Sequence, residues 1–322
     1  MIAARQETED AAVLSLAQLG ARTLLEQLGR ALKHEPGTRA GDDPEELHKM
    51  RVATRRLRVA FKVFGRELAA AGIGTLPEQD VKAVAQAMGG VRDLDVFDEW
   101  LAGQAVARPQ DGAAIDRLRA HRRALRDGAR AVLRDTLDGP AMGAVRDGSL
   151  ALALDTVAHA PARVKKRRRV RCAGPRLADR ALGRLRSAGG ELMAPTSEEL
   201  HRVRILAKRF RYVCEFISPA FGAALDDAIA CATEVQDALG DLHDADVAAP
   251  GLLRDIERVA ADAESARDAA AIARLVEAQH ARRDEALPRF RDAWARLPDK
   301  KALRAAFKRA PASPQLYKEA SE

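Results

Sequence analysis

The chain contains one 13-residue segment twice, and this internal repeat constrains the fold more than any other feature of the sequence. The first copy starts at Glu46 and reads ELHKMRVATRRLR, and the second starts at Glu199 and reads ELHRVRILAKRFR. At a constant offset of 153 residues, Glu, Leu, His and every basic position recur in register, and only apolar or small residues differ. A repeat that keeps its charged positions indicates a shared function in addition to shared packing.

A second segment recurs with nearly the same spacing. Met88–Val96, which reads MGGVRDLDV, reappears as Leu239–Val247, which reads LGDLHDADV, at an offset of 151 residues. Two motifs that repeat in the same order predict that the two halves are copies of one helical unit.

Composition predicts that this unit is all-helical. Ala, Leu and Arg dominate the 322 residues, β-branched runs are few, and Gly and Pro cluster between segments. We therefore expect an all-α fold of two antiparallel helical bundles. The expected boundaries are an N-terminal bundle over 1–160, a basic linker over 161–175, a C-terminal bundle over 176–310 and a tail over 311–322.

Hydrophobic periodicity and the placement of Gly and Pro predict the individual helices. The first runs from about 8 to 34, where Glu35-Pro36-Gly37 would end it, and the first basic segment belongs to a helix that runs to about Ala71. Further helices are expected from 78 onward, from 113 to 137, and over 141–158, 176–188, 197–217, 223–247, 252–280 and 281–296.

Like charges line one face of both repeated helices. At 100° per residue, five side chains of the first copy fall within an arc of about 80°: His48, Arg51, Arg55, Arg58 and Lys62. The second copy repeats this arc with His201, Arg204, Lys208 and Arg211, and Glu215 stands where Lys62 would be. Cations one turn apart repel each other by roughly a few tenths of a kcal/mol per pair. A bound polyanion would relieve this repulsion, whereas a merely solvated face would not explain the matching register.

The histidines and the acidic residues of the repeats allow two interpretations each. His48 and His201 are either buried rings that bond to a carbonyl or donors to phosphate, with affinity rising as the ring protonates near its ordinary pKa of about 6.5. The carboxylates of Arg92-Asp93-Leu94-Asp95 and His243-Asp244-Ala245-Asp246 are either metal ligands or partners that orient arginines of a neighbouring helix. The second interpretation is favoured for the carboxylates, because aspartates so close to arginines pair with them readily.

Two further basic groups lie outside the repeated segments. A stripe at helical spacing consists of Arg119, Arg123, Arg126 and Arg130. A dense block in the linker consists of Arg163, Lys165, Lys166, Arg167, Arg168, Arg169 and Arg171. Such a block is typical of an exposed connector, and it could also extend a track for a polyanion.

The sequence shows no catalytic signature. It has no P-loop, no HExxH and no CxxC pair, and the basic motif holds no Ser or Cys nucleophile, so we expect no enzymatic activity, no cofactor and no metal. The three cysteines form neither an even set nor a CxxC pair, which is typical of a protein in a reducing cytosol. The N-terminus lacks an apolar signal region and no run of 18 apolar residues occurs, so we expect a cytoplasmic protein without a membrane span.

The kind of polyanion follows from what the basic faces lack. Aromatic residues make up only 4% of the chain, although proteins that bind single strands stack bases on aromatic rings. The basic stripes also hold no Asn or Gln, which read base edges in a groove. The pattern therefore favours recognition of phosphate charge over recognition of bases.

These motifs resemble the signature of the CHAD domain family, an all-helical domain named for its histidines. The first hallmark, His-x-x-Arg-x-x-x-Arg-Arg-x-Arg, is matched by His48, Arg51, Arg55, Arg56 and Arg58. The second, His-x-x-Arg-x-x-x-Lys-Arg-x-Arg-Tyr, is matched by His201, Arg204, Lys208, Arg209, Arg211 and Tyr212. The Arg-Asp-x-Asp-Val segment that begins at Arg92 also fits, although His243 replaces this arginine in the second half.

The resemblance implies two bundles related by pseudo-twofold symmetry around a basic pore or groove, and binding of inorganic polyphosphate without catalysis. The expected site comprises His48, Arg51, Arg55, Arg56, Arg58, Lys62, His201, Arg204, Lys208, Arg209 and Arg211, with Arg119, Arg123, Arg126 and Arg130 as a second set. Other polyanions remain candidate partners, and polyphosphate granules are an alternative location. The competing hypotheses are a non-specific nucleic-acid-binding protein and a metal-dependent polyphosphate hydrolase.

Overall fold

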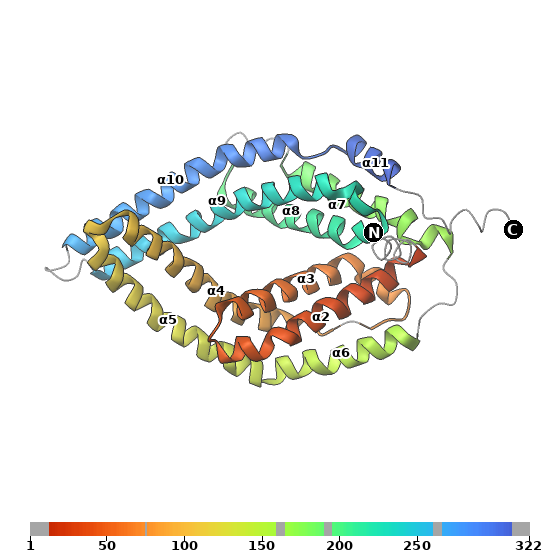
Figure 1. Ribbon diagram of the computed structural model, residues 1–322, viewed down its shortest axis with the longest axis horizontal. Helices are drawn as coiled ribbons and strands as arrows, with labels where there is room; N and C mark the ends of the chain where they lie inside the picture. The colour runs from red at the N-terminus through yellow and green to blue at the C-terminus, as the bar shows by residue number, and fades with distance from the viewer. Residues whose placement is uncertain (1–12, 75, 159–164, 190–194, 260–265, 311–322) are drawn as a thin grey trace.

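The computed structural model describes residues 13–74, 76–158, 165–189, 195–259 and 266–310, and every structural statement below refers to these residues. Apart from one isolated bridge between Ser15 and Arg169, the described elements are all helical (Figure 1). The prediction of an all-α fold is therefore confirmed. No described helix is long and apolar enough to cross a membrane.

The helices fall into two consecutive groups. The first half contains α2 (Leu16–Ala40), α3 (Pro44–Ala69), α4 (Glu78–Ala107), the 3-10 turn η1 (Pro109–Asp111), α5 (Gly112–Asp138) and α6 (Pro140–Ala158). The second half contains η2 (Lys166–Arg168), α7 (Val170–Ala188), α8 (Ser197–Ile217), the short turns η3 (Ser218–Ala220) and η4 (Gly222–Leu225), α9 (Asp226–Val259), α10 (Ala266–Arg296) and α11 (Lys300–Arg309).

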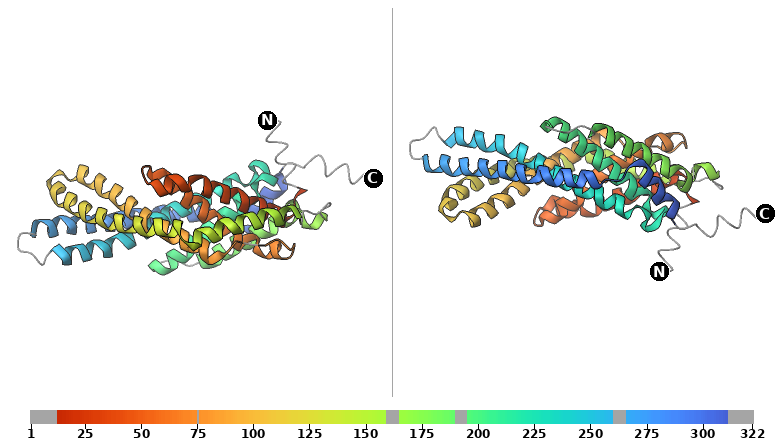
Figure 2. Two further views of the ribbon diagram at one scale, coloured as in Figure 1. Left: turned by 90° about the horizontal axis from the view of Figure 1, so that it is seen from below. Right: turned by 90° about the horizontal axis from the view of Figure 1, so that it is seen from above.

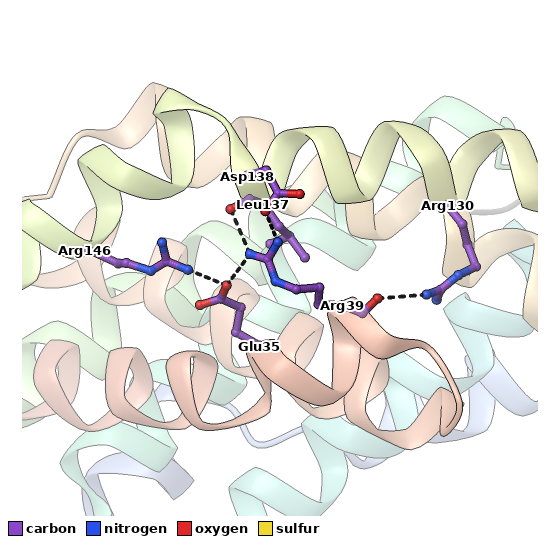
Figure 3. Close-up of polar contacts among 6 residues, drawn as sticks. All are labelled: Glu35, Arg39, Arg130, Leu137, Asp138 and Arg146. Carbon is purple, nitrogen blue, oxygen red and sulfur yellow. Dashed lines mark hydrogen bonds and ion pairs between the residues drawn. The ribbon is translucent and has the colours of Figure 1, made fainter.

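The expected end of the first helix at Glu35-Pro36-Gly37 is wrong, because α2 continues through Pro36 to Ala40. Contacts outside the helix hold its last turn: Arg130 of α5 donates a hydrogen bond of 3.3 Å to the carbonyl of Arg39 (Figure 3) and one of 3.1 Å to the carbonyl of Ala40. The helix ends at Gly41, whose φ is 80° and whose missing side chain leaves room for the Arg130 guanidinium. Residues 8–12 of the expected first helix lie outside the described residues.

Glu35 ties this helix to α5 and α6 (Figure 3). Its carboxylate, 7% exposed, accepts hydrogen bonds from Arg39, at 2.8 Å, and from Arg146. Arg39 also donates to the carbonyl of Leu137 at 3.1 Å and pairs with Asp138. Burial alone would raise the pKa of Glu35, but the bonds from Arg146 and Arg39 outweigh it and hold this pKa below its ordinary value.

The start of α7 in the second half also differs from expectation. α7 begins at Val170 and not at 176, since Arg171 is held by hydrogen bonds of 2.7 and 3.1 Å to the carbonyls of Ala220 and Ala310 and stacks over Phe221. Arg169 is buried, so these two arginines are structural, whereas Lys165, Lys166 and Arg168 are exposed. Arg163 and the tail beyond 310 lie outside the described residues.

α9 and α10 are longer than expected. α9 passes through Pro250 to Val259, and α10 is continuous from Ala266 to Arg296. Ala249 and Leu252 flank this proline and are buried against residues of the first half, so packing maintains the helix across it.

The two halves touch at both ends of the long axis. At one end, which we call the base, α2 and α3 pack on α7 and α8, and the rings of Phe64 and Phe216 lie 5.8 Å apart. At the other end, the tip, the hairpins α4–α5 and α9–α10 meet over a separate apolar cluster (Figure 2). This cluster comprises Leu101, Ile115, Leu118, Ala249, Leu252, Ile272, Leu275 and Val276.

Ion pairs reinforce the tip. Arg117 donates to Asp268 at 2.7 Å, and Arg274 donates to Asp111 at 2.9 Å. Arg122 pairs with Asp255 in the same region. Each pair joins a residue of the first half to one of the second, so charge and apolar burial together close this end.

Replacing Glu35 with Gln is expected to lower the free energy of unfolding by roughly 1–3 kcal/mol, since Arg39 and Arg146 lose a charged acceptor. These arginine side chains are 33% and 47% exposed, so solvent screening should place the loss at the lower end of that range. The pKa of Glu35 is held below its ordinary 4.5, so its contribution is present above that pH and is lost as the pH falls through the folded-state value. Urea unfolding at several pH values measures both effects.

The matched control is Glu26→Gln in the same helix, because Glu26 pairs with Arg30 at 2.6 Å and both side chains are more than half exposed. This variant should stay within about 0.5 kcal/mol of the wild type. An equal loss in both variants would contradict the structural role given to Glu35.

Candidate functional site

The apolar stripes of α3 and α8 determine where their basic faces point. Leu47, Met50 and Leu57 of α3, and Val203 and Phe210 of α8, are all at most 3% exposed. Each helix therefore packs by this stripe and presents the adjacent basic arc to one side of it. The two helices contact each other at the base.

Hydrogen bonds cross between the halves at these two helices. Arg55 Nε of α3 donates to Tyr212 Oη of α8 at 2.9 Å, and Arg209 Nη2 of α8 donates to the carbonyl of Lys62 at 3.2 Å. The repeated segments, far apart in the sequence, are thus neighbours in space.

Four cations meet where these helices oppose each other, and we call Arg51, Arg55, Arg204 and Lys208 the facing cluster. Burial is the main cause that lowers the pKa of Lys208 to about 7, and the charges on Arg204, Arg55 and Arg51 act in the same direction, whereas Asp244 opposes them. Burial also lowers the pKa of Arg51 and of Arg204, and each is further lowered by Arg55. The facing cluster therefore holds concentrated positive charge with restricted access to water.

Two carboxylates partly offset this charge. Asp93 of α4 approaches Arg51 at 3.5 Å, but its side chain is 76% exposed. Asp244 of α9 acts on Arg51, Arg204 and Lys208 together. Asp237 of α9 also acts on Lys208, and even with this third acid the four cations leave the facing cluster short of negative charge. The sequence pointed to Asp244 only through its place in the second repeated segment.

His48 borders the facing cluster in its neutral form. Burial lowers the pKa of His48, the charges of Arg92, Arg55 and Arg51 lower it further, and Glu45 opposes them. Protonation of His48 is therefore expected below pH 6.5, so at neutral pH it offers one donor and one acceptor without charge. His48 makes no hydrogen bond to a carbonyl within the described part of the chain, so the first of its two interpretations gains no support.

The second half has a pair of rings at the corresponding place. His201 and His243 lie with their centroids 5.0 Å apart. The pKa of His243 is lowered by burial first, and then by Arg204, His201 and Lys208, against Asp244. This neutral ring separates the facing cluster from the outer side of α8, where His201 is exposed.

Three expected site residues take part in the contact between the halves. Arg56 pairs with Glu215 and lies over the rings of Tyr212 and Phe216, at 5.2 and 5.5 Å. Arg211 lies 3.4 Å from Glu215 and 4.9 Å from the Tyr212 ring. Glu215, which stands where a lysine would complete the second stripe, thus neutralises two arginines and joins α8 to α3. Arg209 belongs to the same contact through its bond to Lys62.

The remaining two residues of the first stripe lie apart from the facing cluster. Lys62 has an exposed side chain. Arg58 is half-buried, and its Nε finds no acceptor among the described residues. Both stay predictions as binding residues.

The stripe on α5 faces its own acidic partners. Arg119 donates two bonds of 2.8 and 2.9 Å to Asp98, and Arg126 bonds to Asp95. Arg130 is 8% exposed and caps α2, whereas Arg123 is exposed. The structure does not bring these four arginines into the facing cluster, and their role in binding is untested.

The acids of the second repeated segments pair with arginines, as the favoured interpretation expected. Asp246 bonds to Arg283 at 2.9 Å, and Asp241 bonds to Arg282 and Arg289 at 2.6 and 2.8 Å. Within the described ranges, no three His, Cys, Asp or Glu side chains are grouped so that they could hold a metal ion. These carboxylates orient the helices beside the facing cluster.

Comparison with known proteins agrees with this arrangement. The crystal structure of the CHAD domain from the plant Ricinus communis superposes with a TM-score of 0.63 at 21% identity, covering 94% of each chain. PptA from Streptomyces chartreusis superposes with a TM-score of 0.62 at 17% identity, covering 88% of this chain and all of the other. At these identities the two likenesses show the fold alone. No protein with a curated description matches the chain.

The sequence match is more direct. The model of the CHAD domain family matches residues 22–253, which include both basic segments and both halves of the facing cluster. Because this match spans more than half of the chain, the protein belongs to the CHAD domain family.

Proposed function

We propose that this protein binds inorganic polyphosphate through the facing cluster and does not catalyse its turnover. One observation carries the proposal: Arg51 and Arg55 from one half oppose Arg204 and Lys208 from the other, with too few carboxylates to balance them. A chain of phosphates would supply the missing negative charge. Family membership supports this reading, because the residues of the facing cluster are those of the family signature.

The chemistry of the four side chains suits a phosphate chain. A guanidinium can donate two parallel hydrogen bonds to phosphate oxygens, and an ammonium adds a compact point charge. The partial burial that lowers the pKa of Lys208 and of the arginines also lowers the local dielectric, so a bound anion gains more there than on an open surface.

The aromatic rings near the facing cluster argue against a nucleic-acid ligand. Tyr212 is 1% exposed and Phe210 is fully buried. Neither ring is available to stack on a base, which single-strand binding proteins use for much of their affinity. We therefore rank nucleic acid second, and the proposal retains a cytoplasmic location, where the ligand would be free or in granules.

Binding should depend on the facing arginines more than on total charge. Wild-type protein is titrated with long-chain polyphosphate by calorimetry at two salt concentrations, and the double variant Arg51→Ala/Arg204→Ala is compared with it. We expect the variant to lose roughly tenfold or more in affinity, because each charge-assisted bond contributes about 1.5–3 kcal/mol. Its affinity should also vary less with salt, since fewer counterions are released.

The control variant Lys166→Ala/Arg168→Ala removes two exposed charges from the linker and should bind within about twofold of the wild type. Equal losses in the two double variants would refute the facing cluster as the site. Single-stranded RNA of matched charge serves as competitor, and full displacement of polyphosphate would favour the nucleic-acid hypothesis. Release of phosphate in the presence of magnesium or manganese would contradict the absence of catalysis.

Affinity should also fall as the pH rises through about 7. Free Lys208 has a pKa of about 7, and a bound polyanion must raise it, so binding takes up a proton above neutrality. The affinity for polyphosphate is therefore highest below pH 7 and declines above it. Calorimetry in buffers of different ionisation enthalpy measures the proton uptake directly.

Lys208→Arg is the matched control, because it keeps the positive charge without a titration near neutrality. This variant should bind as tightly at pH 8.5 as at pH 6.5. Asp237, Asp244 and His243 of α9 also surround Lys208, and burial raises the pKa of Asp237 and lowers that of His243. A slope that persists in the variant would assign the pH dependence to Asp237 or His243 and not to the lysine.

A further inference from the structure

A second cationic surface lies on the outer side of the C-terminal half. α7, α8 and α11 form a groove with a volume of about 1100 Å³. Four exposed cations line it, namely Arg180, Arg184, Arg202 and Lys300. Within the described residues, none of the four makes a hydrogen bond or ion pair. None of them belongs to the family motifs on which the proposed function rests.

The acidic residues of the groove are already engaged. Asp179 pairs with Arg304 at 2.9 Å. Glu199 accepts bonds of 2.8 and 3.0 Å from the backbone N–H and hydroxyl of Thr196 and so completes the N-terminal cap of α8. Among the described residues that line the groove, Glu198 is then the one acid left to balance the four cations, so this lining carries an excess of positive charge.

The first half has a groove at the same place in the repeat, but the cations of this groove are paired with acids. It is about 330 Å³ in volume and includes Lys49, 153 residues before Arg202. Its cations have partners: Arg30 pairs with Glu26 at 2.6 Å, and Lys49 lies 3.9 Å from Glu46.

One glutamate accounts for part of the difference in cation pairing between the two grooves. Glu46 lies 2.9 Å from Nδ1 of His34 and 3.9 Å from Lys49, two residues that line the groove of the first half. Its repeat counterpart, Glu199, turns to Thr196 instead. Of the two groove linings that the structure describes, that of the second half therefore contains cations without a partner, whereas Arg30 and Lys49 of the first are paired.

The groove of the second half is adjacent to the facing cluster. His201 is one of its lining residues, and the same ring lies 5.0 Å from that of His243. Arg204, a member of the facing cluster, is one helical turn beyond His201 on α8. A chain that leaves the facing cluster past Arg204 would meet the groove at His201.

From this geometry we propose that the groove between α7 and α8 is a second binding segment for polyphosphate, which holds the part of a long chain that extends beyond the facing cluster. The inference rests on the proposed function and adds the direction in which a long polyphosphate chain extends from the facing cluster. A long chain leaves the facing cluster toward the C-terminal half, and the groove of the N-terminal half takes no part. Affinity should then rise with chain length through Arg180 and Arg202.

The test compares two double variants that remove the same charge from the two grooves. Arg180→Gln/Arg202→Gln alters the groove of the second half, and Arg30→Gln/Lys49→Gln alters that of the first; all four side chains are exposed. Each variant is titrated with long-chain polyphosphate and with the shortest linear polyphosphate that the wild type binds measurably. Circular dichroism confirms that each variant is folded.

We expect Arg180→Gln/Arg202→Gln to weaken the long chain about tenfold and to reduce the slope of log affinity against log salt by about one to two, while the short chain binds within twofold of the wild type. Arg30→Gln/Lys49→Gln should bind both chains like the wild type. The inference is overturned if the long chain is unaffected, if both chains weaken equally, or if the two double variants behave alike. Failure of the proposed function is separate, because it would show as binding that survives Arg51→Ala/Arg204→Ala or as no binding by the wild type.

Discussion

The structure depends on burial of one apolar stripe on each of two repeated helices. Met50 and Leu57 of α3, and Val203 and Phe210 of α8, are almost fully buried and fix the rotation of each helix about its axis. Because the basic arc is adjacent to the apolar stripe, packing α3 and α8 against each other at the base also brings like charges together. Hydrophobic burial thus holds in place an arrangement that electrostatics alone would oppose.

Glu215 reduces the repulsion between the basic arcs that apolar burial brings together. At the end of α8 it neutralises Arg56 and Arg211, and these arginines lie over the rings of Tyr212 and Phe216. The halves therefore adhere where the charges are paired, and in this contact the excess positive charge lies at Arg51, Arg55, Arg204 and Lys208. A strict repeat with lysine at this position would have spread the repulsion along the whole contact.

The sequence predicted the local features well and the features that depend on tertiary contacts poorly. The helices α3 and α8 were expected because a cap precedes a long 3.6-residue periodicity in each, and the basic arcs followed from the same spacing. The continuation of α2 through Pro36 was missed because its last carbonyls are satisfied by Arg130, which is about 90 residues away. The division of the basic residues between the facing cluster and the contact at Glu215 also requires the relative position of the halves. The groove cations were missed for the same reason, since Arg180 and Lys300 lie on separate helices and share no motif.

The two ends of the molecule are held by different forces, and this gives ionic strength a selective effect. The base packs aromatic and aliphatic side chains, including Phe64 against Phe216, which added salt does not weaken. The tip relies partly on charge pairs such as Arg117 with Asp268 and Arg274 with Asp111, in which the arginine side chains are 62% and 43% exposed, so mobile ions screen them. Rising salt therefore weakens these exposed ion pairs, whereas the apolar cluster at the tip and the packing at the base keep their stabilisation. The salt that weakens the binding of a polyanion is then also the salt that weakens the ion pairs between the two hairpins of the tip.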